Sequence, residues 1–384
     1  MTTVQTLAGK EIVLAVTGSI AAVECVKLIH AFRRKGASVQ VVMSSGAAGI
    51  VTPDALTYAC GRPVITRISG MVEHVTFCGD GGSADLLVIA PCTANTISKI
   101  ACAIDDTPVT TFATTAIGSG MPVLVVPAMH HSMFRHPGLT ENIERLEEWG
   151  IRILSPRIEE GKAKITDIDE IILESERAVM GKPLAGKKVL ITSGPCKEPV
   201  DDVRILTTRS SGMMGKELAL QAFRLGADVT IIHGDTIPCV TNINAVSSGE
   251  MRDAVMNELA IRGGTDIYIS AAAISDFAPQ KTPGKIRSGK PATISLTPLP
   301  KLLDEVMQEY SPFTVAFKIE QKPEAPAQAM LKKGIPVVLM NHPDTMGSSN
   351  GTYELLTTHG SKNLSGSKEE IAKEVWNALL GMIQ

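Results

Sequence analysis

The chain has 384 residues, of which 44% are hydrophobic and 20% are charged, and its formal net charge is -3. This length suits about two domains, and the weak negative charge argues against nucleic acid or an anionic membrane as a partner. The seven cysteines form no CxxC pair, which disfavours a disulfide framework or a zinc ribbon. Because the N-terminus lacks a signal-like pattern and no apolar run reaches the roughly 18 residues of a membrane span, we expect a cytoplasmic protein that binds small ligands.

The first predicted unit runs from Glu11 to Met43 and consists of an apolar strand, a glycine-containing turn, a helix and a second strand. Such a unit directs the turn and the N-terminal amides of the helix toward one place, where the helix dipole favours a phosphate. The turn TGSIAA (17–22) has one glycine instead of GxGxxG. The hydroxyl of Ser19 suits a single phosphate, and it suits an ordinary helix cap equally well.

Strands and helices keep alternating through the rest of the first half of the chain. This alternation predicts a doubly wound parallel sheet with helices on both faces. Polar loops follow three of the strands, and the carboxyl ends of parallel strands should bring these loops together at one edge. The strands are expected at 39–43, 85–90, 122–127 and 151–154, the helices at 53–60, 94–103 and 140–149, and the loops at 43–47, 90–99 and 125–134.

The alternation loosens between residues 155 and 188, where an acidic helix at 167–180 precedes the segment GKPLAGKK. Glycine and proline are typical of a linker, so we assign residues 1–183 to the first domain and 184–384 to the second. The second domain repeats the alternation of the first and is also expected to be doubly wound. Its first strand and the glycine turn after it are expected at 187–195, further strands at 229–233, 267–270, 314–317 and 336–340, and a final helix at 368–382.

The turn after the first strand of the second domain is longer than its counterpart in the first domain, and its segment PCKEPVDDVRILTTRSSG is polar and charged. A long connection in a compact α/β unit is usually functional, which favours substrate or nucleotide contact over an ordinary solvated loop. Asp276, after a predicted strand, suits a turn cap as well as a ribose or magnesium contact. A lone histidine such as His74 is more often structural than catalytic, so its local sequence leaves its role open.

In chain order, the segments TGSIAA, EHV around His74, APCTANTISKIA, DDTPVTT and PAMHxxM resemble the flavin-dependent phosphopantothenoylcysteine decarboxylase family. The second half resembles the phosphopantothenate-cysteine ligase family through TSGPxxEPxDxVRxxTxxSSGxMG (192–215), AAAISDF (271–277) and GKI (284–286). The motifs are collinear and cover nearly the whole chain. The chain therefore resembles the bifunctional family of coenzyme A biosynthesis, in an archaeal-like variant.

For the first domain, the resemblance implies a flavodoxin-like fold that binds FMN and decarboxylates phosphopantothenoylcysteine. In this chemistry the flavin oxidises the cysteinyl thiol, so that the neighbouring carbon can accept the electrons left by CO2. His74 matches the family's active-site histidine, and His130 stands where the family has the asparagine of a PxMN motif. The residues that the resemblance places at FMN are Gly18, Ser19, Ile20, Ser44, Thr93, Asn95, Thr96 and Ser98.

The flap of the first domain departs from the family pattern. Bacterial members carry a flap cysteine that protonates the enethiolate during its return reduction, whereas this chain has EEGKAKI (159–165) at that place. Either another acid serves, with Lys162 and Lys164 as candidates, or the last reduction proceeds differently. One alternative is therefore an active ligase fused to a flavin domain with lost or altered chemistry. Another is a flavoprotein that acts as a binding or regulatory module.

For the second domain, the resemblance implies CTP-dependent ligation, although the sequence leaves the choice between CTP and ATP open. Phosphopantothenate attacks the α-phosphate, giving an acyl nucleotide and pyrophosphate, and the amine of cysteine then displaces the nucleotide. The resemblance implies that Lys285 is catalytic and that Mg2+ takes part, with Asp276 as a possible ligand of the metal. The family suggests trimeric flavin domains and dimeric ligase domains, up to a dodecamer. The implied substrate and nucleotide residues are Gly194, Arg204, Thr208, Ser211, Gly212, Ala272, Ala273, Asp276, Lys285, Phe317, Lys333 and Asn341.

Overall fold

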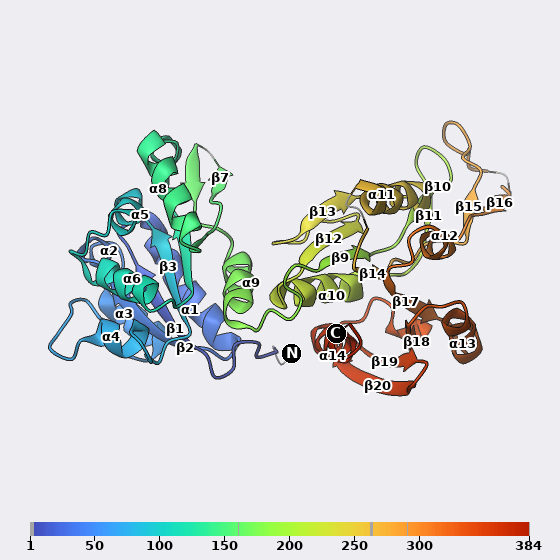
Figure 1. Cartoon of the computed structure of the whole chain (residues 1–384). Helices are drawn as coiled ribbons and strands as arrows, with labels where there is room; N and C mark the ends of the chain where they lie inside the picture. The colour runs from blue at the N-terminus through green and yellow to red at the C-terminus, as the bar shows by residue number, and fades with distance from the viewer. Residues whose placement is uncertain (1–3, 160, 262–263, 290, 384) are drawn as a thin grey trace. The chain divides into compact units, whose positions relative to one another are not determined.

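The computed structural model describes residues 4–159, 161–261, 264–289 and 291–383. The chain forms two compact units, 1–180 and 181–384, and each unit has its own sheet with helices packed against it (Figure 1). No helix in the described part of the chain is both long and apolar enough to cross a bilayer.

The sheet of the first unit has five parallel strands in the order β2-β1-β3-β4-β6. Apolar runs form these strands, and nearly every residue of β1, β3 and β4 is buried because helices cover both faces. This is the 2-1-3-4-5 order of flavodoxin-like sheets, in which the order reverses between β1 and β3. The strands are β1 (Glu11–Val16), β2 (Ser38–Met43), β3 (Leu86–Cys92), β4 (Val123–Pro127) and β6 (Arg152–Ile153).

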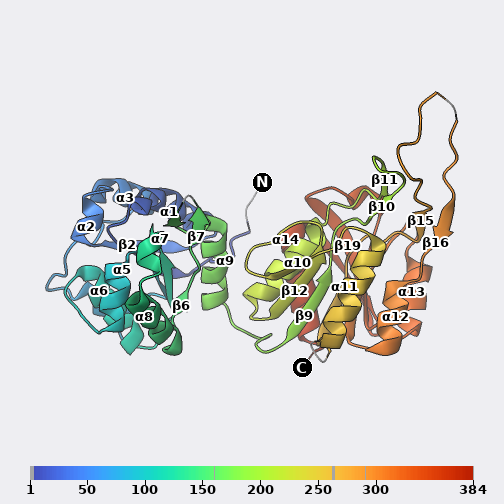
Figure 2. The ribbon, with the colours of Figure 1, turned by 90° about the horizontal axis from the view of Figure 1, so that it is seen from above.

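Helices cover both faces of this sheet (Figure 2). One face packs against α1 (Cys25–Arg34), α3 (Pro53–Cys60) and α9 (Ile168–Val179). The other face packs against α5 (Ala94–Ala101), α6 (Pro108–Gly118) and α8 (Pro137–Glu148). The shorter helices are η1 (Ile20–Glu24), α2 (Ser45–Ala48), α4 (Glu73–Cys78) and α7 (His131–Phe134).

A separate three-stranded antiparallel sheet lies in the first unit, with the order β5-β8-β7. The hairpin of β7 (Arg157–Glu159) and β8 (Lys162–Lys164) pairs with β5 (Met129–His130), the segment that follows β4. The flap sequence is thereby joined by backbone pairing to the segment that contains His130.

The sheet of the second unit has eight strands in the order β13-β12-β9-β14-β17-β18-β19-β20. The first six are parallel and follow the 3-2-1-4-5-6 order of a Rossmann sheet, with the reversal between β9 and β14. They are β9 (Lys188–Thr192), β12 (Asp228–His233), β13 (Thr241–Asn244), β14 (Ile267–Ser270), β17 (Phe313–Ile319) and β18 (Val337–Asn341). The antiparallel hairpin of β19 (Asn350–Thr357) and β20 (Gly360–Ser367) extends the sheet.

Helices also cover this second sheet on both sides (Figure 2). The indole Nε1 of Trp376, which is fully buried, donates to the backbone of Leu218 at 2.9 Å and ties α14 to α10. Two short ribbons project from the unit, β10 (Lys197–Pro199) with β11 (Ile205–Thr207), and β15 (Phe277–Pro279) with β16 (Leu296–Pro298). The helices are α10 (Met213–Arg224), α11 (Ser248–Ile261), α12 (Leu302–Glu309), α13 (Glu324–Lys332), η2 (Pro343–Thr345) and α14 (Lys368–Leu380).

The prediction of two doubly wound α/β domains is confirmed by both strand orders. The second sheet differs from the prediction because it is mixed, since the unpredicted hairpin β19–β20 adds two antiparallel strands. The helix α6 was also unpredicted. Its sequence PVTTFATTAIG is rich in β-branched residues, and a capping box between Thr107 and Thr110 starts the helix.

Candidate functional site

Three hydroxyl side chains cap helical segments at the carboxyl ends of β1, β2 and β3. Ser19 accepts a hydrogen bond from the backbone N–H of Ala21 at 3.4 Å and caps η1. In the same way, Ser44 caps α2 and Thr93 caps α5, each at 3.3 Å. We call Ser19, Ser44 and Thr93 the hydroxyl cradle. It lies at the strand-order reversal, where open α/β sheets bind their ligands.

The loops that carry the cradle are held close together. Gly18 allows the turn after β1 to approach the turn after β2, because a Cβ on Gly18 would lie 3.0 Å from the carbonyl carbon of Gly46. The buried hydroxyl of Thr17 donates to the carbonyl of Pro91 at 2.7 Å and accepts from the N–H of Thr93 at 3.0 Å. Backbone amides and hydroxyls at such a point suit an anionic group such as a phosphate.

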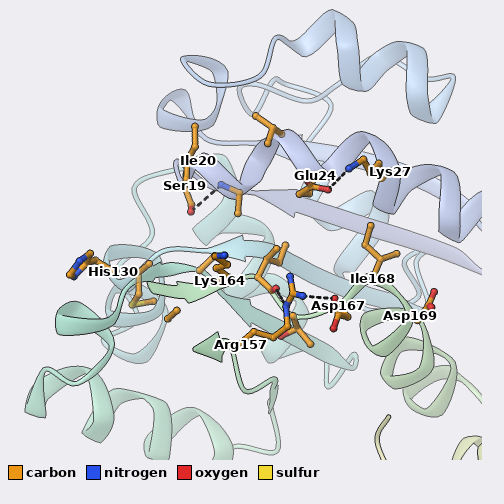
Figure 3. A pocket seen from close by; sticks show the side chains of 17 residues that line it. Ser19, Ile20, Glu24, Lys27, His130, Arg157, Lys164, Asp167, Ile168 and Asp169 are labelled. Carbon is orange, nitrogen blue, oxygen red and sulfur yellow. Dashed lines mark hydrogen bonds and ion pairs between the residues drawn. The ribbon is translucent and has the colours of Figure 1, made fainter. Parts of the chain in front are cut away.

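A cavity of about 870 Å³ lies beside the cradle. Ser19 and Ile20 lie on one side of it, and His130, Lys164 and Arg157 on the other (Figure 3). Aliphatic side chains make up much of the wall, and the 77% exposure of Ile20 leaves an apolar surface for a ligand. A partly apolar cavity with a few polar groups at its rim is typical of a small-molecule site.

The cations around this cavity are already in ion pairs. Arg157 lies 2.8 Å from the carboxylate of Asp167, and Lys27 lies 3.0 Å from Glu24 (Figure 3). Lys164 of the flap hairpin bonds Glu159 at 2.9 Å, which holds the pKa of that carboxyl below its ordinary value. The cavity is therefore polar at its rim without a strong excess of one charge.

The histidines after β4 have distinct surroundings. The Nδ1 atom of His130, on the exposed rim, lies 2.9 Å from the hydroxyl of Ser132 and accepts from its N–H at 3.4 Å. The backbone N–H of His131 donates to Gly161 of the hairpin at 3.3 Å, whereas its buried Nδ1 has no hydrogen-bond partner. The sequence did not single out His131, and only its place beside the flap marks it.

The remaining predicted residues of the first site do not line the cavity. Ser44 and Thr93 belong to the cradle, Gly18 precedes its Ser19, and the hydroxyl of the buried Thr96 lies 3.1 Å from that of Thr93. Further along α5, Asn95 is exposed and Ser98 is half-buried. The side chain of Lys162, one of the two flap candidates, lies outside the described residues.

His74 lies on α4, away from the residues that line the cavity. Its ring meets that of Phe112 on α6 edge to face, with the centroids 6.5 Å apart. The buried Nδ1 of His74 has no hydrogen-bond partner. An imidazole nitrogen without a partner is costly to bury.

The second unit has a cavity of about 480 Å³ beyond the carboxyl ends of β14, β17 and β18. The N-terminus of α10 opens onto it through Gly212, whose φ of 71° is the left-handed conformation that glycine tolerates. Gly215 lets α10 pack on the end of β9, because a Cβ there would lie 2.3 Å from the hydroxyl oxygen of Ser193. Eight predicted residues line this cavity: Thr208, Ser211, Gly212, Ala272, Ala273, Asp276, Phe317 and Asn341.

Four predicted residues of the second unit do not line that cavity: Gly194, Arg204, Lys285 and Lys333. Gly194 packs against Gly212, because a Cβ added to Gly212 would lie 3.1 Å from the Cα of Gly194. Lys333 is in an exposed ion pair with Asp304 at 3.1 Å. Lys285 is exposed and lies between β15 and β16 in the sequence.

Asp201 fixes the base of the loop that carries Lys285. Its buried carboxylate accepts from the N–H of Ile286 at 3.0 Å and from the N–H groups of Val203 and Arg204 at 2.8 and 2.6 Å. These bonds, with the guanidinium of Arg204, hold the pKa of Asp201 well below its usual range. No role was predicted for Asp201, although it lies within the matched ligase motif.

Two further residues of the second cavity, Tyr353 and Lys368, were not predicted. Both lie close to the C-terminus, on the unpredicted strand β19 and on the first turn of α14. In the described part of the chain, no three His, Cys, Asp or Glu side chains form a group that could hold a metal ion.

Two family models match the chain. The model described as Flavoprotein matches residues 2–180, and the model described as DNA/pantothenate metabolism flavoprotein C-terminal domain matches residues 184–382.

Curated relatives match over almost their whole length. The coenzyme A biosynthesis bifunctional protein CoaBC of Thermococcus kodakarensis is 41% identical, with 98% of this chain and 96% of the relative covered. The protein of the same name from Escherichia coli is 30% identical, with 95% of each chain covered.

Two solved structures are similar to parts of the chain. The C-terminal domain of a CoaBC protein is 26% identical with a TM-score of 0.44, covering 53% of this chain and 98% of its own. The FMN-dependent cysteine decarboxylase SpaF is 27% identical with a TM-score of 0.39, covering 43% of this chain and 94% of its own.

Proposed function

This chain belongs to the family of coenzyme A biosynthesis bifunctional proteins, and on that premise we propose how its two units share the work. It is a bifunctional enzyme that ligates phosphopantothenate to cysteine and decarboxylates the resulting phosphopantothenoylcysteine. We assign the decarboxylase to residues 1–183 and the ligase to residues 184–384. The observation that carries the assignment is that each unit has a cavity at the carboxyl ends of its parallel strands, lined by residues of the matching motif.

We propose that the first unit binds FMN with its phosphate in the hydroxyl cradle. The residues fit such a group, because the close approach at Gly18 brings the amides and hydroxyls of Ser19, Ser44 and Thr93 to one point. Ile20 would lie against the flavin, and Asn95, Thr96 and Ser98 stay proposed contacts. When bound, FMN supplies the acceptor and donor of two electrons that decarboxylation of a cysteine derivative requires.

Two histidines take different roles in this proposal. His130, on the cavity rim, donates a hydrogen bond to the substrate carboxylate. His74 accepts the thiol proton, a task that suits an imidazole. His74 lies on α4 and does not line the cavity, and we propose that a second copy of the chain brings its His74 to the ligand. The exposed apolar side chains of Met71 and Val75 beside His74 support association with another copy.

The flap favours a second version of the first reaction. The hairpin of β7 and β8 has no cysteine at any described position, and its Lys164 is bonded to Glu159. Lys164 or Lys162 would replace the cysteine as the acid of the final reduction. If neither lysine does so, the unit would decarboxylate its substrate and release the unsaturated enethiol. The two electrons would then stay on the flavin, and an external acceptor such as O2 would have to reoxidise it before the next turnover.

We propose that the second unit binds CTP with Mg2+ in the cavity at α10. The N-terminal amides of α10 suit phosphate oxygens, the small side chains of Ala272 and Ala273 admit a nucleotide near the backbone, and Asp276 is available to the metal. The carboxylate of phosphopantothenate attacks the α-phosphorus of CTP, and pyrophosphate leaves. The amine of cysteine then attacks the acyl carbon, and the nucleoside monophosphate leaves. Further proposed contacts are Gly194, Arg204, Thr208, Ser211, Gly212, Phe317, Lys333 and Asn341.

Lys285 is the proposed catalytic cation of the ligase. It lies on a loop whose base is fixed by Asp201 but whose tip is exposed, so the loop must close to bring the ammonium to the nucleotide. Homo-oligomers, with trimeric flavin units and paired ligase units, belong to the same proposal. We also propose a cytoplasmic location, which rests on the metabolic role of the enzyme.

The experiment measures both reactions of one preparation. Pyrophosphate release is followed with CTP or ATP, phosphopantothenate and cysteine, and CO2 release is followed from phosphopantothenoylcysteine with the flavin spectrum recorded. The variant His74→Asn should slow CO2 release by about 10²- to 10⁴-fold, as expected for a lost acid–base group. Pyrophosphate release should stay unchanged. The control His136→Asn keeps a capping side chain at the exposed start of α8. Unchanged CO2 release in His74→Asn would refute its role.

A further inference from the structure

Lys368 has an unusual position for a lysine. It is the first residue of α14, directly after the N-cap Ser367, and only 6% of it is exposed. The N-terminus of a helix carries a partial positive charge and disfavours a cation. Burial away from water disfavours the ammonium as well and lowers the pKa of Lys368. Two effects therefore oppose a charged lysine at this place.

Among the residues that the structure describes, no nearby carboxylate compensates for these costs. The Nζ of Lys368 donates to the hydroxyl of Tyr353 and lies 4.4 Å from the centroid of its ring. Burial raises the pKa of Tyr353 to about 12, so this partner stays a neutral phenol. In the described residues, no Asp or Glu oxygen lies within ion-pair distance of the Lys368 Nζ. A buried ammonium with only a neutral partner is suited to an anionic ligand.

The surroundings of Lys368 open toward the second cavity. Lys368, Tyr353 and Asn341 all line it and are each at least nine-tenths buried. Asn341 donates to the hydroxyl of Thr345 at 2.6 Å, while its buried Oδ1 has no partner. Gly351 keeps the space beside the amine free, because a Cβ there would lie 3.2 Å from the Lys368 Nζ and 3.0 Å from the Tyr353 ring.

We propose that Lys368 binds a phosphate oxygen of one of the two phosphorylated substrates of the ligase. The proposal rests on the ligase function given above, which brings a nucleoside triphosphate and phosphopantothenate into one cavity. Lysine is a common phosphate ligand as a compact point charge. The phosphate supplies the negative charge that the site lacks, and the hydroxyl of Tyr353 orients the amine. Lys368 is therefore a substrate-binding residue in the part of the cavity that is lined by residues of β18, β19 and α14.

The test compares Lys368→Met with the control Lys362→Met in the full-length protein. Lys362 is exposed on β20 and pairs with Glu374 at 2.7 Å, outside the cavity. Pyrophosphate release gives the KM of the nucleotide, of phosphopantothenate and of cysteine separately. Lys368→Met should raise the KM of one phosphorylated substrate by about 10- to 100-fold, the usual effect of losing a charged hydrogen bond. The KM of cysteine should change by less than about 2-fold, since only phosphate binding is lost.

The substrate whose KM rises identifies the source of the phosphate. Thermal unfolding without substrates gives a second readout, because removal of an uncompensated buried charge should leave the Tm of Lys368→Met equal to or above that of the wild type. Unchanged KM values for both phosphorylated substrates would overturn the proposal. A lower Tm or failed folding in both Lys368→Met and Lys368→Gln would overturn it too, because the amine would then be structural. A wild type that releases no pyrophosphate would instead refute the ligase function itself.

Discussion

Gly215 provides the sharpest test of how the second unit builds its proposed nucleotide site. This glycine lies in the first turn of α10, where the helix packs on the end of β9. In the variant Gly215→Ala, the new Cβ would meet the Cβ of Ser193 at 2.6 Å and its hydroxyl oxygen at 2.3 Å. The hydroxyl can rotate away from this contact, but the Cβ of Ser193 is fixed to the strand. The helix must therefore shift away from β9, and its N-terminal amides must move with it.

The expected cost follows from two opposing effects. Overpacking a tight contact costs about 1–3 kcal/mol, and contact with a Cβ belongs to the upper part of that range. Alanine is better than glycine in a helix by about 1 kcal/mol. The net destabilisation is therefore about 2 kcal/mol. For a unit of this size it corresponds to a decrease in Tm of about 4–8 °C.

Calorimetry of the full chain and the two activities measure the effect. Gly215→Ala should lower the Tm of the second unit and raise the KM of the nucleotide in pyrophosphate release, with CO2 release unchanged as an internal control. The matched control is Gly249→Ala in the first turn of α11, where a Cβ would have no atom within 4 Å. Ser193→Gly removes the contacted Cβ and also the hydrogen bond from the Ser193 hydroxyl to the carbonyl of Gly212 at 3.0 Å. It should therefore cost less stability in Gly215→Ala than in the wild type.

The reasoning is refuted if Gly215→Ala unfolds at the same temperature as Gly249→Ala and keeps the wild-type KM for the nucleotide. It is also refuted if Ser193→Gly costs as much stability in Gly215→Ala as in the wild type, because the strain would then not lie between these two residues.

Three further predictions concern the loops that build the two sites. Gly18→Ala should weaken flavin binding at least about 10-fold, because its Cβ would press on Gly46 and a strain of about 1.4 kcal/mol in the bound state has this effect. The flavin absorbance retained after gel filtration measures the loss. Thr17→Val removes both hydrogen bonds of a buried hydroxyl and should lower the stability of the first unit by about 1–3 kcal/mol, measured by calorimetry; an unchanged Tm would contradict this. Asp201 has a lowered pKa, chiefly because it accepts from the N–H of Ile286. Its stabilisation is therefore complete above about pH 5 and is lost as the pH falls below the unfolded pKa of about 3.9, so the Tm difference from Asp201→Asn should shrink in acid.

Much of the fold could be predicted because buried parallel strands leave continuous apolar runs in the sequence. The runs at 85–90 and 122–127 became β3 and β4, and the helix expected at 53–60 is α3 with the same bounds. The hairpin β19–β20 escaped prediction because β20 (Gly360–Ser367) is largely polar and exposed, so it lacks an apolar run. Its place in the sheet depends on pairing with β19, a non-local interaction that local sequence does not encode.

The candidate sites were predictable where they follow strand ends. The loops after β1, β2 and β3 meet in the cradle, as the parallel topology requires. Lys368 was missed for a physical reason, since a lysine after a serine cap looks in the sequence like an ordinary surface residue. Its burial arises from the unpredicted neighbour Tyr353, 15 residues away in the chain.

The pairing of β5 with β8 has a consequence for the timing of turnover in the first unit. Met129 pairs with Ala163 and His130 with Lys162, so the same backbone ladder holds the covering hairpin and the residue proposed to grip the carboxylate. The hairpin cannot swing outward without breaking or dragging this ladder. If substrate enters by movement of this hairpin, the backbone at His130 would move with it, and closure would place the hairpin and the imidazole together.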